Sequence, residues 1–233
     1  MADTLVREDD ELAARRSARR VAVGAGAIGL IAVLVWVVVF SSVLGAKRVA
    51  VHGAHAVPVN RIVSAADVPH GRPLLRLDTG GIARRVEALP DVAAVSVHVS
   101  YPSTVVITVT ERVAVGYLDD GGKAILIDKS GRQFRTVAAA PSALPRFDVP
   151  AGDTATGQAI ATVAGALTPA LLGRLTSIGA SDSSAITLRL RDGRTVRWGS
   201  AERSADKALV LPALLARAGT TFDVSNPDVV TAR

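Results

Sequence analysis

The feature that most constrains this chain is an uninterrupted apolar run from Val21 to Leu44. These 24 residues include no Asp, Glu, Lys, Arg or His. A helix of this length rises about 36 Å, which is enough to cross a hydrocarbon core of about 30 Å. A helix also pairs its own backbone N–H and C=O groups, as a hydrocarbon environment requires. The run therefore predicts a single transmembrane helix over 21–44.

Three other interpretations of this run are weaker. Gly24, Gly26 and Gly29 spell the dinucleotide-binding pattern G-x-G-x-x-G, but no acidic residue follows before Asp67. A cleaved signal peptide has a shorter apolar region of about 7–15 residues, and a buried core helix is usually shorter as well. The small residues are instead typical of a face on which another membrane helix packs closely.

Positive charge flanks the run unevenly. Four arginines precede it and two basic residues follow it, namely Arg15, Arg16, Arg19 and Arg20 before it and Lys47 and Arg48 after it. The more positive side of a membrane helix stays in the cytoplasm. We therefore expect a disordered cytoplasmic tail over 1–20 and a single-pass type II protein of the plasma (inner) membrane, with the bulk of the chain outside the cytoplasm.

Composition limits the chemistry of the outer part. The chain has no cysteine, which excludes disulfides, a thiol nucleophile and Cys-ligated zinc. The tail holds as many acidic residues as arginines, so the net charge of +6 belongs to the rest of the chain. Such a surface suits anionic lipid or wall polymers, or is simply solvated. Nucleic acid is not an expected partner, because no basic stretch is interleaved with aromatic residues.

Residues 46–114 predict a small α+β domain with the order β-α-α-β-β. The pattern alternates over 47–52, becomes helical after Pro58, is broken by glycine and proline, and is helical again from Gly80 to Leu89. Two further strands follow around 95–99 and 105–109. The apolar phase of these elements predicts a core that comprises Leu75, Ile82, Val86, Val97 and Ile107.

Residues 115–225 predict a mainly antiparallel β domain with flanking helices. We expect a hairpin around 117–128, a helix over 159–172, strands over 186–190 and 195–198, and a second helix over about 201–218. The apolar face of that second helix is expected to hold Leu209, Leu214 and Leu215. A last strand over 220–225 precedes an extended C-terminal tail, 226–233.

No motif predicts catalysis, a cofactor, a metal or a small-molecule substrate. Ser204 and Lys207 match the S-x-x-K of penicillin-recognising enzymes, but neither K-T-G nor S-D-N is present. We therefore expect a solvent-facing Ser and Lys one helical turn apart. The histidines, which are His52, His55, His70 and His98, lack the H-E-x-x-H spacing of a zinc site and are expected to be ordinary surface or strand residues.

The last clear strand is the predicted partner-binding site, with Thr221, Phe222, Asp223, Val224 and Ser225 as its residues. Little chain follows this strand, so we expect it to form a sheet edge with unpaired backbone groups. An extended segment of another protein binds such an edge through main-chain hydrogen bonds. The alternative is that Phe222 belongs to the core and that the tail covers the edge.

The order of the motifs resembles the FtsQ/DivIB family of bacterial cell-division proteins, in an actinobacterial-like form. The POTRA-like motifs are Val49-x-Val51-x-Gly53, Gly71-x-Pro73-Leu74-Leu75-x-Leu77-Asp78, Leu89-Pro90-x-Val92, and Tyr101-Pro102-Ser103-Thr104-Val105 followed by Glu111-Arg112. The motifs of the second domain are Asp192-Gly193, Trp198-Gly199-Ser200 and Lys207. Val113-Ala114-Val115 departs from the proline-containing R-x-P-V that is more usual in the family.

The resemblance implies a non-enzymatic scaffold of the division complex that is concentrated at the septum. It further implies FtsB- and FtsL-like partners, with FtsB docked on the C-terminal strands, and a link between early and late components of septum assembly. The alternative is a POTRA-containing factor for protein secretion or envelope assembly. A cell-wall enzyme is a more distant alternative.

Overall fold

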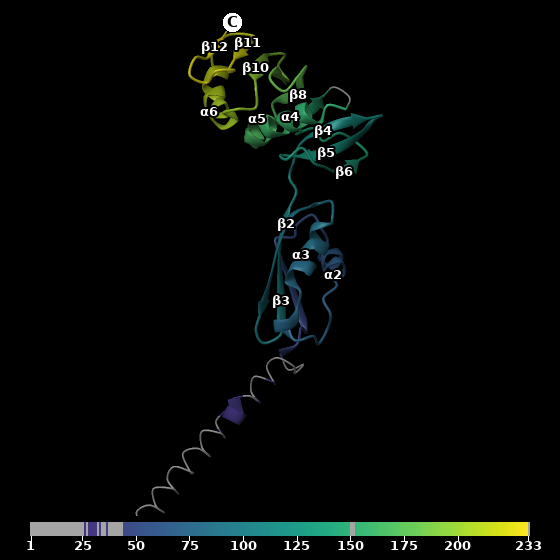
Figure 1. The fold of residues 1–233 in the computed structure, drawn as a ribbon. Coiled ribbons are helices and arrows are strands. Elements are labelled where there is room, and N and C mark those ends of the chain that lie inside the picture. Colours follow the sequence, from purple (N-terminus) through teal and green to yellow (C-terminus); the bar gives the residue numbers. More distant parts are fainter. Residues whose placement is uncertain are drawn as a thin grey trace, which may run out of the picture. The chain divides into compact units, whose positions relative to one another are not determined.

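The computed structural model describes residues 26, 28–31, 33, 36, 44–149 and 152–232. They form two compact units (Figure 1). The first unit comprises the described residues up to Leu89 together with Ala94–Thr110, and the second comprises Pro90–Ala93 and the described residues from Glu111 onward. The predicted tail and most of the predicted transmembrane helix lie outside the described residues, although the described positions between 26 and 36 are helical. Within the described part of the chain, no helix is both long and apolar enough to span a membrane.

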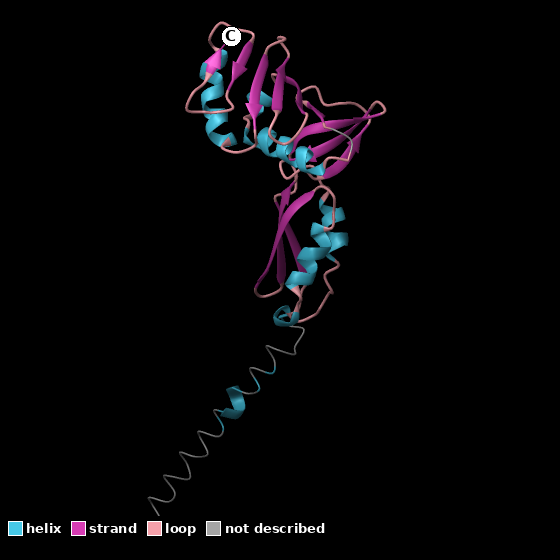
Figure 2. Cartoon of the chain, turned by 45° about the horizontal axis from the view of Figure 1, so that its top comes forward, coloured by secondary structure: helices cyan, strands magenta, loops and turns pink. Residues whose placement is uncertain are grey.

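The first unit is a three-stranded sheet with helices packed on it, in the expected β-α-α-β-β order (Figure 2). The strands lie in the order β1-β3-β2, and β1 is parallel to β3. The elements of this unit are β1 (Arg48–His52), α2 (Val59–Ala66), the 3-10 turn η2 (Leu74–Arg76), α3 (Thr79–Glu87), β2 (Val92–Ser100) and β3 (Thr104–Glu111).

The two helices of the first unit are fixed by an N-cap and by one arginine. Asp78 accepts a hydrogen bond of 2.8 Å from the backbone N–H of Gly81, which is the normal way to begin a helix such as α3. Arg85 of α3 donates from Nη2 and Nε to the carbonyl oxygen of Ala66, at 2.6 and 3.1 Å. Because Ala66 ends α2, this cation satisfies a carbonyl that has no partner inside the helix.

Three of the five predicted core residues of the first unit are buried. Ile82, Val86 and Ile107 are at most 1% exposed, and Val97 is half-buried. Leu75 was expected in the core, but it is 55% exposed, and Leu74 is buried in its place. Consecutive residues of a 3-10 turn point about 120° apart, so only one of the two leucines of η2 can face the core.

The second unit contains one nine-stranded sheet and three helices among its described residues. The sheet order is β12-β11-β10-β9-β8-β7-β4-β5-β6. The strands are β4 (Ala114–Asp120), β5 (Lys123–Asp128), β6 (Gln133–Val137), β7 (Arg146–Asp148), β8 (Leu175–Ala180), β9 (Ile186–Leu190), β10 (Thr195–Gly199), β11 (Thr221–Asp223) and β12 (Thr231–Ala232). The helices are α4 (Thr154–Ala166), α5 (Pro169–Leu172) and α6 (Ser204–Leu215).

This sheet is more mixed than the sequence suggested. Most neighbouring strands are antiparallel, but β4–β7, β7–β8 and β10–β11 are parallel pairs. A parallel pair needs a long connection that returns the chain to the same end of the sheet. The helices α4 and α5 provide that return between β7 and β8, and α6 provides it between β10 and β11.

The core of the second unit lies between one face of this sheet and its helices. The side chains of Ile178, Leu188, Val196 and Phe222 are completely buried and belong to the same cluster as the apolar residues of α4 and α6. Neighbouring positions in the same strands, such as Arg189 and Arg197, are exposed. The alternation of period 2 therefore places one face on the core and the other in solvent.

Both predicted helices of this unit differ from expectation. The helix expected over 159–172 is two helices, because Thr168 caps a new helix that has Pro169 at its first position. On α6 the predicted Leu214 and Leu215 are buried, but Leu209 is 79% exposed and Leu211 is buried. The face was assigned incorrectly because two of its buried positions are polar residues, Ser204 and Lys207, which apolar periodicity does not count.

A buried ion pair joins the start of the second unit to the β5–β6 turn. Arg112 Nη1 pairs with Asp128 Oδ2, and the two side chains are only 8% and 7% exposed. The other carboxylate oxygen of Asp128 accepts from Ser130 N at 2.9 Å, Ser130 Oγ at 2.6 Å and Arg132 N at 3.1 Å. Arg112 Nε also donates to the carbonyl oxygen of Pro90. Both charges are therefore well satisfied.

We predict that Asp128→Asn destabilises the second unit by about 3–5 kcal/mol at pH 7, because it leaves Arg112 buried without a counter-charge. Burial alone raises the pKa of Asp128, but hydrogen bonds from Ser130, Arg112 and Arg132 outweigh burial and lower that pKa. A lowered pKa stabilises the fold above the unfolded value of about 4, and this contribution is lost as the pH falls below it. The difference between wild type and variant should therefore shrink from about pH 4 downward.

Urea unfolding in detergent, followed by Trp198 fluorescence in a Trp36→Phe background, measures this difference, because the chain has only these two tryptophans. Asp120→Asn, at an exposed hairpin position, is the control. An Asp128→Asn variant that is as stable as this control at pH 7 contradicts the prediction.

Candidate partner-binding edge

The predicted edge strand is not the edge of the sheet. β11 pairs with β10 in parallel on one side and with β12 antiparallel on the other, with Asp223 opposite Thr231 and Phe222 opposite Ala232. The segment after β11 turns at Asn226-Pro227 and returns as β12, so the structure shows the alternative in which Phe222 belongs to the core and the C-terminal segment covers this strand. The edges of the described sheet are therefore β12 and, at the other end, β6 (Figure 1).

The five predicted site residues divide between core and surface. Phe222 and Val224 are completely buried and belong to the core of the unit. Thr221 and Ser225 are exposed, and Asp223 is half-buried. The Asp223 carboxylate accepts from Ser225 N at 2.9 Å and Ser225 Oγ at 2.6 Å, which turns the chain directly after β11. Only the polar members of the predicted set can meet a partner directly.

A buried lysine fixes α6 against the end of β10. Lys207 is 1% exposed, and its Nζ donates to the carbonyl oxygens of Trp198 at 3.1 Å and Ser200 at 2.9 Å. The ammonium also lies 5.9 Å from the centroid of the Trp198 ring, within reach of a cation–π attraction. Burial lowers the pKa of Lys207. Lys207 and the Trp198-Gly199-Ser200 motif therefore form one structural cluster, which we call the Lys207 lock.

The serine of the S-x-x-K match belongs to the same lock. Ser204 is buried, accepts a hydrogen bond from Trp198 Nε1 at 3.2 Å and donates to the carbonyl oxygen of Ala201 at 2.7 Å. The expectation of a solvent-facing Ser and Lys is therefore wrong, because both side chains are committed to structural hydrogen bonds. The arrangement does not present Ser204 as a nucleophile to solvent.

Gly199 gives the end of β10 its shape. Its φ of +78° lies in the left-handed region, and the register between β9 and β10 shifts at this point. A Cβ at this position would lie 3.0 Å from the Cβ of Ser225. Glycine therefore allows the chain that follows β11 to pass close beside β10.

An ion pair holds the segment between β11 and β12 on α6. Arg203 donates from Nη1 and Nη2 to the two carboxylate oxygens of Asp228, at 2.7 and 3.1 Å, and from Nε to Asp206 at 3.0 Å. The hydrogen bonds from Arg203 lower the pKa of Asp228. This fork-shaped contact is exposed, but it fixes the approach to β12 in one geometry.

Four candidate residues at or near the β12 edge were not identified from the sequence, namely Arg203, Asp228, Thr231 and Ala232. The signal for β12 was present, because Val229-Val230-Thr231 is a β-branched run directly after an Asn-Pro turn. No comparable signal existed for Arg203, since its partner Asp228 lies 25 residues away in the sequence.

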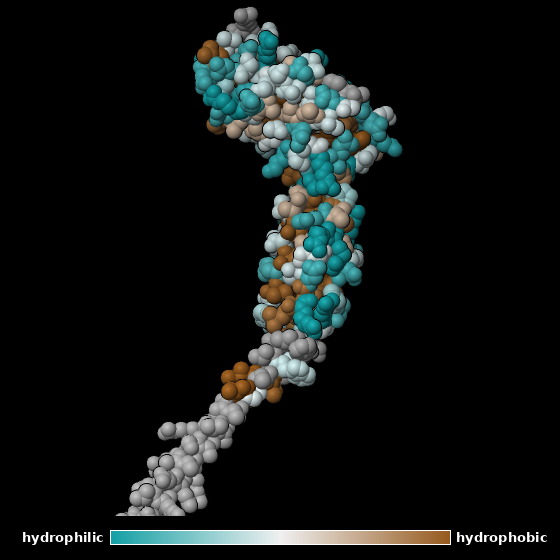
Figure 3. Space-filling model, in the orientation of Figure 1, coloured by the Kyte–Doolittle hydropathy of each residue, from teal (hydrophilic) through white to brown (hydrophobic). Residues whose placement is uncertain are grey.

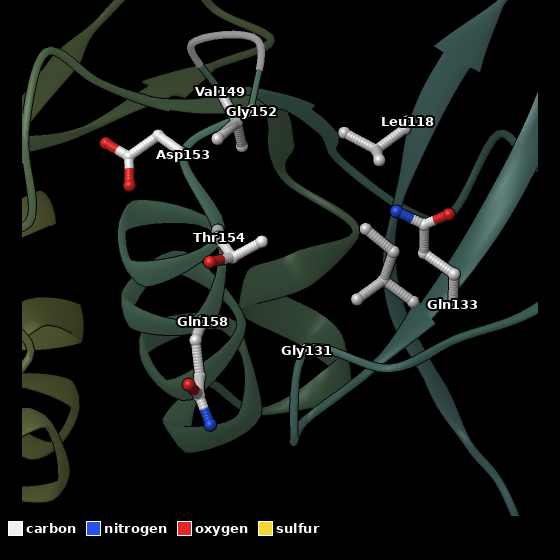
Figure 4. Close-up of a pocket in the computed structure, with 10 residues that line it drawn as sticks. Leu118, Gly131, Gln133, Val149, Gly152, Asp153, Thr154 and Gln158 are labelled. Atoms are coloured by element: carbon white, nitrogen blue, oxygen red, sulfur yellow. The ribbon is translucent and has the colours of Figure 1, made fainter.

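The second unit also contains a pocket of about 320 Å³ between the start of α4 and the strands β5 and β6 (Figure 4). Leu118, Ile127 and Val149 form its apolar lining, and its ten lining residues include no His, Lys or Arg. Its one carboxylate, Asp153, caps α4 by accepting from Thr156 N at 3.0 Å and from the Thr156 hydroxyl. These lining residues hold no acid–base pair.

The histidines considered as metal ligands do not form a site in the described structure. Among the described residues, no group of three or more His, Cys, Asp or Glu side chains is placed to bind a metal. His52, His55, His70 and His98 are all exposed.

The chain has the architecture of a class of proteins in which a POTRA unit is followed by a domain built on a mixed β-sheet. A family model described as "POTRA domain, FtsQ-type" matches residues 44–112, and one described as "Cell division protein FtsQ/DivIB, C-terminal" matches residues 116–230. The chain therefore belongs to the FtsQ/DivIB family of bacterial cell division proteins, as its motifs suggested.

Curated relatives agree with this assignment. The chain is 39% identical over 196 residues to a cell division protein FtsQ of Mycolicibacterium smegmatis, which covers 83% of this chain and 59% of that protein. It is 37% identical over 216 residues to an FtsQ of Streptomyces venezuelae, which covers 87% of this chain and 79% of that protein. The chain thus spans about three fifths of the length of the first of these relatives.

A solved structure is also similar to part of the chain. It is the major extracytoplasmic domain of the trans isomer of the cell division protein DivIB from Geobacillus stearothermophilus. The match is 22% identical, covers 46% of this chain and 93% of that one, and has a TM-score of 0.38.

We predict that Lys207→Ala destabilises the second unit by about 2–4 kcal/mol, because it opens a cavity and leaves the carbonyl groups of Trp198 and Ser200 without their donor. Leu209→Ala, on the exposed face of the same helix, should change the stability by less than about 0.5 kcal/mol. Urea unfolding of the detergent-solubilised chain in the Trp36→Phe background, followed by Trp198 fluorescence, measures both values. Equal stability of the two variants would show that the lysine does not hold α6.

Proposed function

We propose that this chain is a non-enzymatic scaffold of the bacterial division complex. In this proposal a single membrane helix over 21–44 anchors it in the plasma membrane, with the tail in the cytoplasm and both folded units outside. It binds FtsB- and FtsL-like division proteins and so connects early and late components of septum assembly. Its membership of the FtsQ/DivIB family supports the role in division.

The observation that carries the binding part of the proposal is the edge strand β12. It has a neighbour on only one side in the described sheet, so its outer backbone groups can accept a strand from another chain. Thr231 is exposed, and Val229, just before the strand, is 67% exposed. A partner strand would therefore find main-chain groups for affinity and adjacent side chains for selectivity.

The surroundings of β12 favour binding because they limit its motion. The Lys207 lock positions α6 on β10, and the Arg203–Asp228 pair ties the preceding segment to the start of α6. A strand that is already ordered loses less conformational entropy on binding than a free tail does. The correction of the predicted site from β11 to β12 thus keeps the mode of binding and moves its position by one strand.

We predict that a photo-crosslinking residue at Thr231 captures the FtsB-like protein of the same host several-fold more efficiently than one at Thr136. Thr136 is the matched control, because it is an exposed threonine on β6, the opposite edge of the sheet. Crosslinking in cells followed by immunoblotting measures both yields. A yield from Thr136 that equals or exceeds the yield from Thr231 places the partner elsewhere.

A further inference from the structure

Three segments that are distant in sequence meet at one end of the first unit, where the chain enters it. Gly45 forms an antiparallel bridge with Pro73. Ala46 N donates to the carbonyl oxygen of Arg72 at 2.9 Å, and Gly71 N donates to the carbonyl oxygen of Ala46 at 2.9 Å. The loop that leads into η2 is therefore bound to the first described residues after Leu44.

The hairpin between β2 and β3 lies at the same end. Lys47 N and Arg48 N both donate to the carbonyl oxygen of Ser103, at 2.9 and 3.2 Å. In Figures 1 and 2 the tip of this hairpin lies beside the point at which the chain enters the unit. The hairpin tip includes Tyr101, whose side chain is 53% exposed.

The side chains at this end, which we call the entry surface, are basic and apolar. The entry surface comprises Lys47, Arg48, Arg72, Leu75, Arg76 and Tyr101, all of them exposed. The segments 45–48, 70–76 and 101–104 contain four Lys or Arg residues and no acidic residue, and the nearest acidic groups are Asp67 and Asp78, which line a hollow with Arg72. Figure 3 shows strongly hydrophilic and hydrophobic surface side by side at this end of the unit.

The position of the entry surface in the chain sets its distance from the proposed anchor. Lys47 follows Leu44 by three residues, which extend over at most about 11 Å. The headgroup layer on each side of a bilayer is roughly 5–8 Å thick. If 21–44 spans the membrane, Lys47 and the segments bonded to its neighbours lie at or just beyond the headgroups.

We infer that the entry surface is a membrane-contact site that binds anionic lipid headgroups. The basic side chains meet the phosphates, and Leu75 and Tyr101 enter the interfacial layer. Tyrosine favours that layer because its ring is apolar and its hydroxyl is polar. Opposite charges separated by less than a Debye length of about 8–10 Å attract appreciably at physiological salt. The side chain of Leu75, which the geometry of η2 directs away from the core, then has an apolar environment.

This inference rests on the proposed membrane anchor and goes beyond the division role. Contact at the entry surface would fix the first unit at the bilayer, since a flexible link at Leu44 alone would let it swing. Basic groups together with exposed apolar or aromatic side chains are the usual composition of a surface that lies on a membrane.

The test uses the whole chain in vesicles, and the absence of native cysteine permits single-site labels. Leu75→Cys, Tyr101→Cys, Val33→Cys and Leu209→Cys each receive an environment-sensitive fluorophore, and spin-labelled lipid serves as the quencher. In vesicles of phosphatidylglycerol and phosphatidylcholine we expect at least twofold more quenching at positions 75 and 101 than at position 209. Leu209 is the control because it is 79% exposed and belongs to the other unit.

Charge dependence is measured on the same labels. Lys47→Gln together with Arg48→Gln, or vesicles of phosphatidylcholine alone, should reduce the quenching at positions 75 and 101 to the level at position 209. Quenching at position 33 should not change, because it reports the anchor.

The outcomes separate this inference from the anchor on which it rests. Quenching at position 33 without excess quenching at positions 75 and 101 overturns the lipid-contact site and leaves the anchor standing. No quenching at position 33 overturns both. Quenching at positions 75 and 101 that is the same in both lipid mixtures overturns the assignment of anionic headgroups as the ligand.

Discussion

The C-terminal end of the nine-stranded sheet depends on one buried cation. Lys207 can remain charged inside the unit because two carbonyl oxygens and the face of Trp198 replace the water that it loses. By holding α6 on β10, it fixes the helix that returns the chain for the parallel strand β11. β12 then pairs with β11, so the position of this edge of the described sheet follows from contacts made inside the unit.

Much of the fold was predictable from local pattern. The β-α-α-β-β order, the buried Ile82, Val86 and Ile107, and the strands β9 and β10 all follow from periods of 3.6 and 2. The misplaced residues have a common cause. Leu75 and Leu209 lie on the surface, although hydrophobic periodicity assigns apolar residues at these positions to the core. Lys207 lies inside the unit, although periodicity assigns a charged residue to solvent.

The candidate site was predicted only in outline. Sequence pattern identified a terminal strand, but whether that strand is an edge depends on pairing with a segment of only two residues, Thr231 and Ala232. The Arg203–Asp228 pair is likewise a contact between distant positions, which no local rule reveals. The pattern that most resembled an active site, Ser204 with Lys207, proved to be structural once its hydrogen-bond partners were known.

The central claim is that a chain with these two units acts as a scaffold in division. Depletion of the protein in its native host, followed by fluorescence microscopy of membranes and nucleoids, tests this claim most directly. The account predicts filaments with segregated nucleoids and no septa. Normal septa together with a defect in secretion or envelope assembly would contradict it.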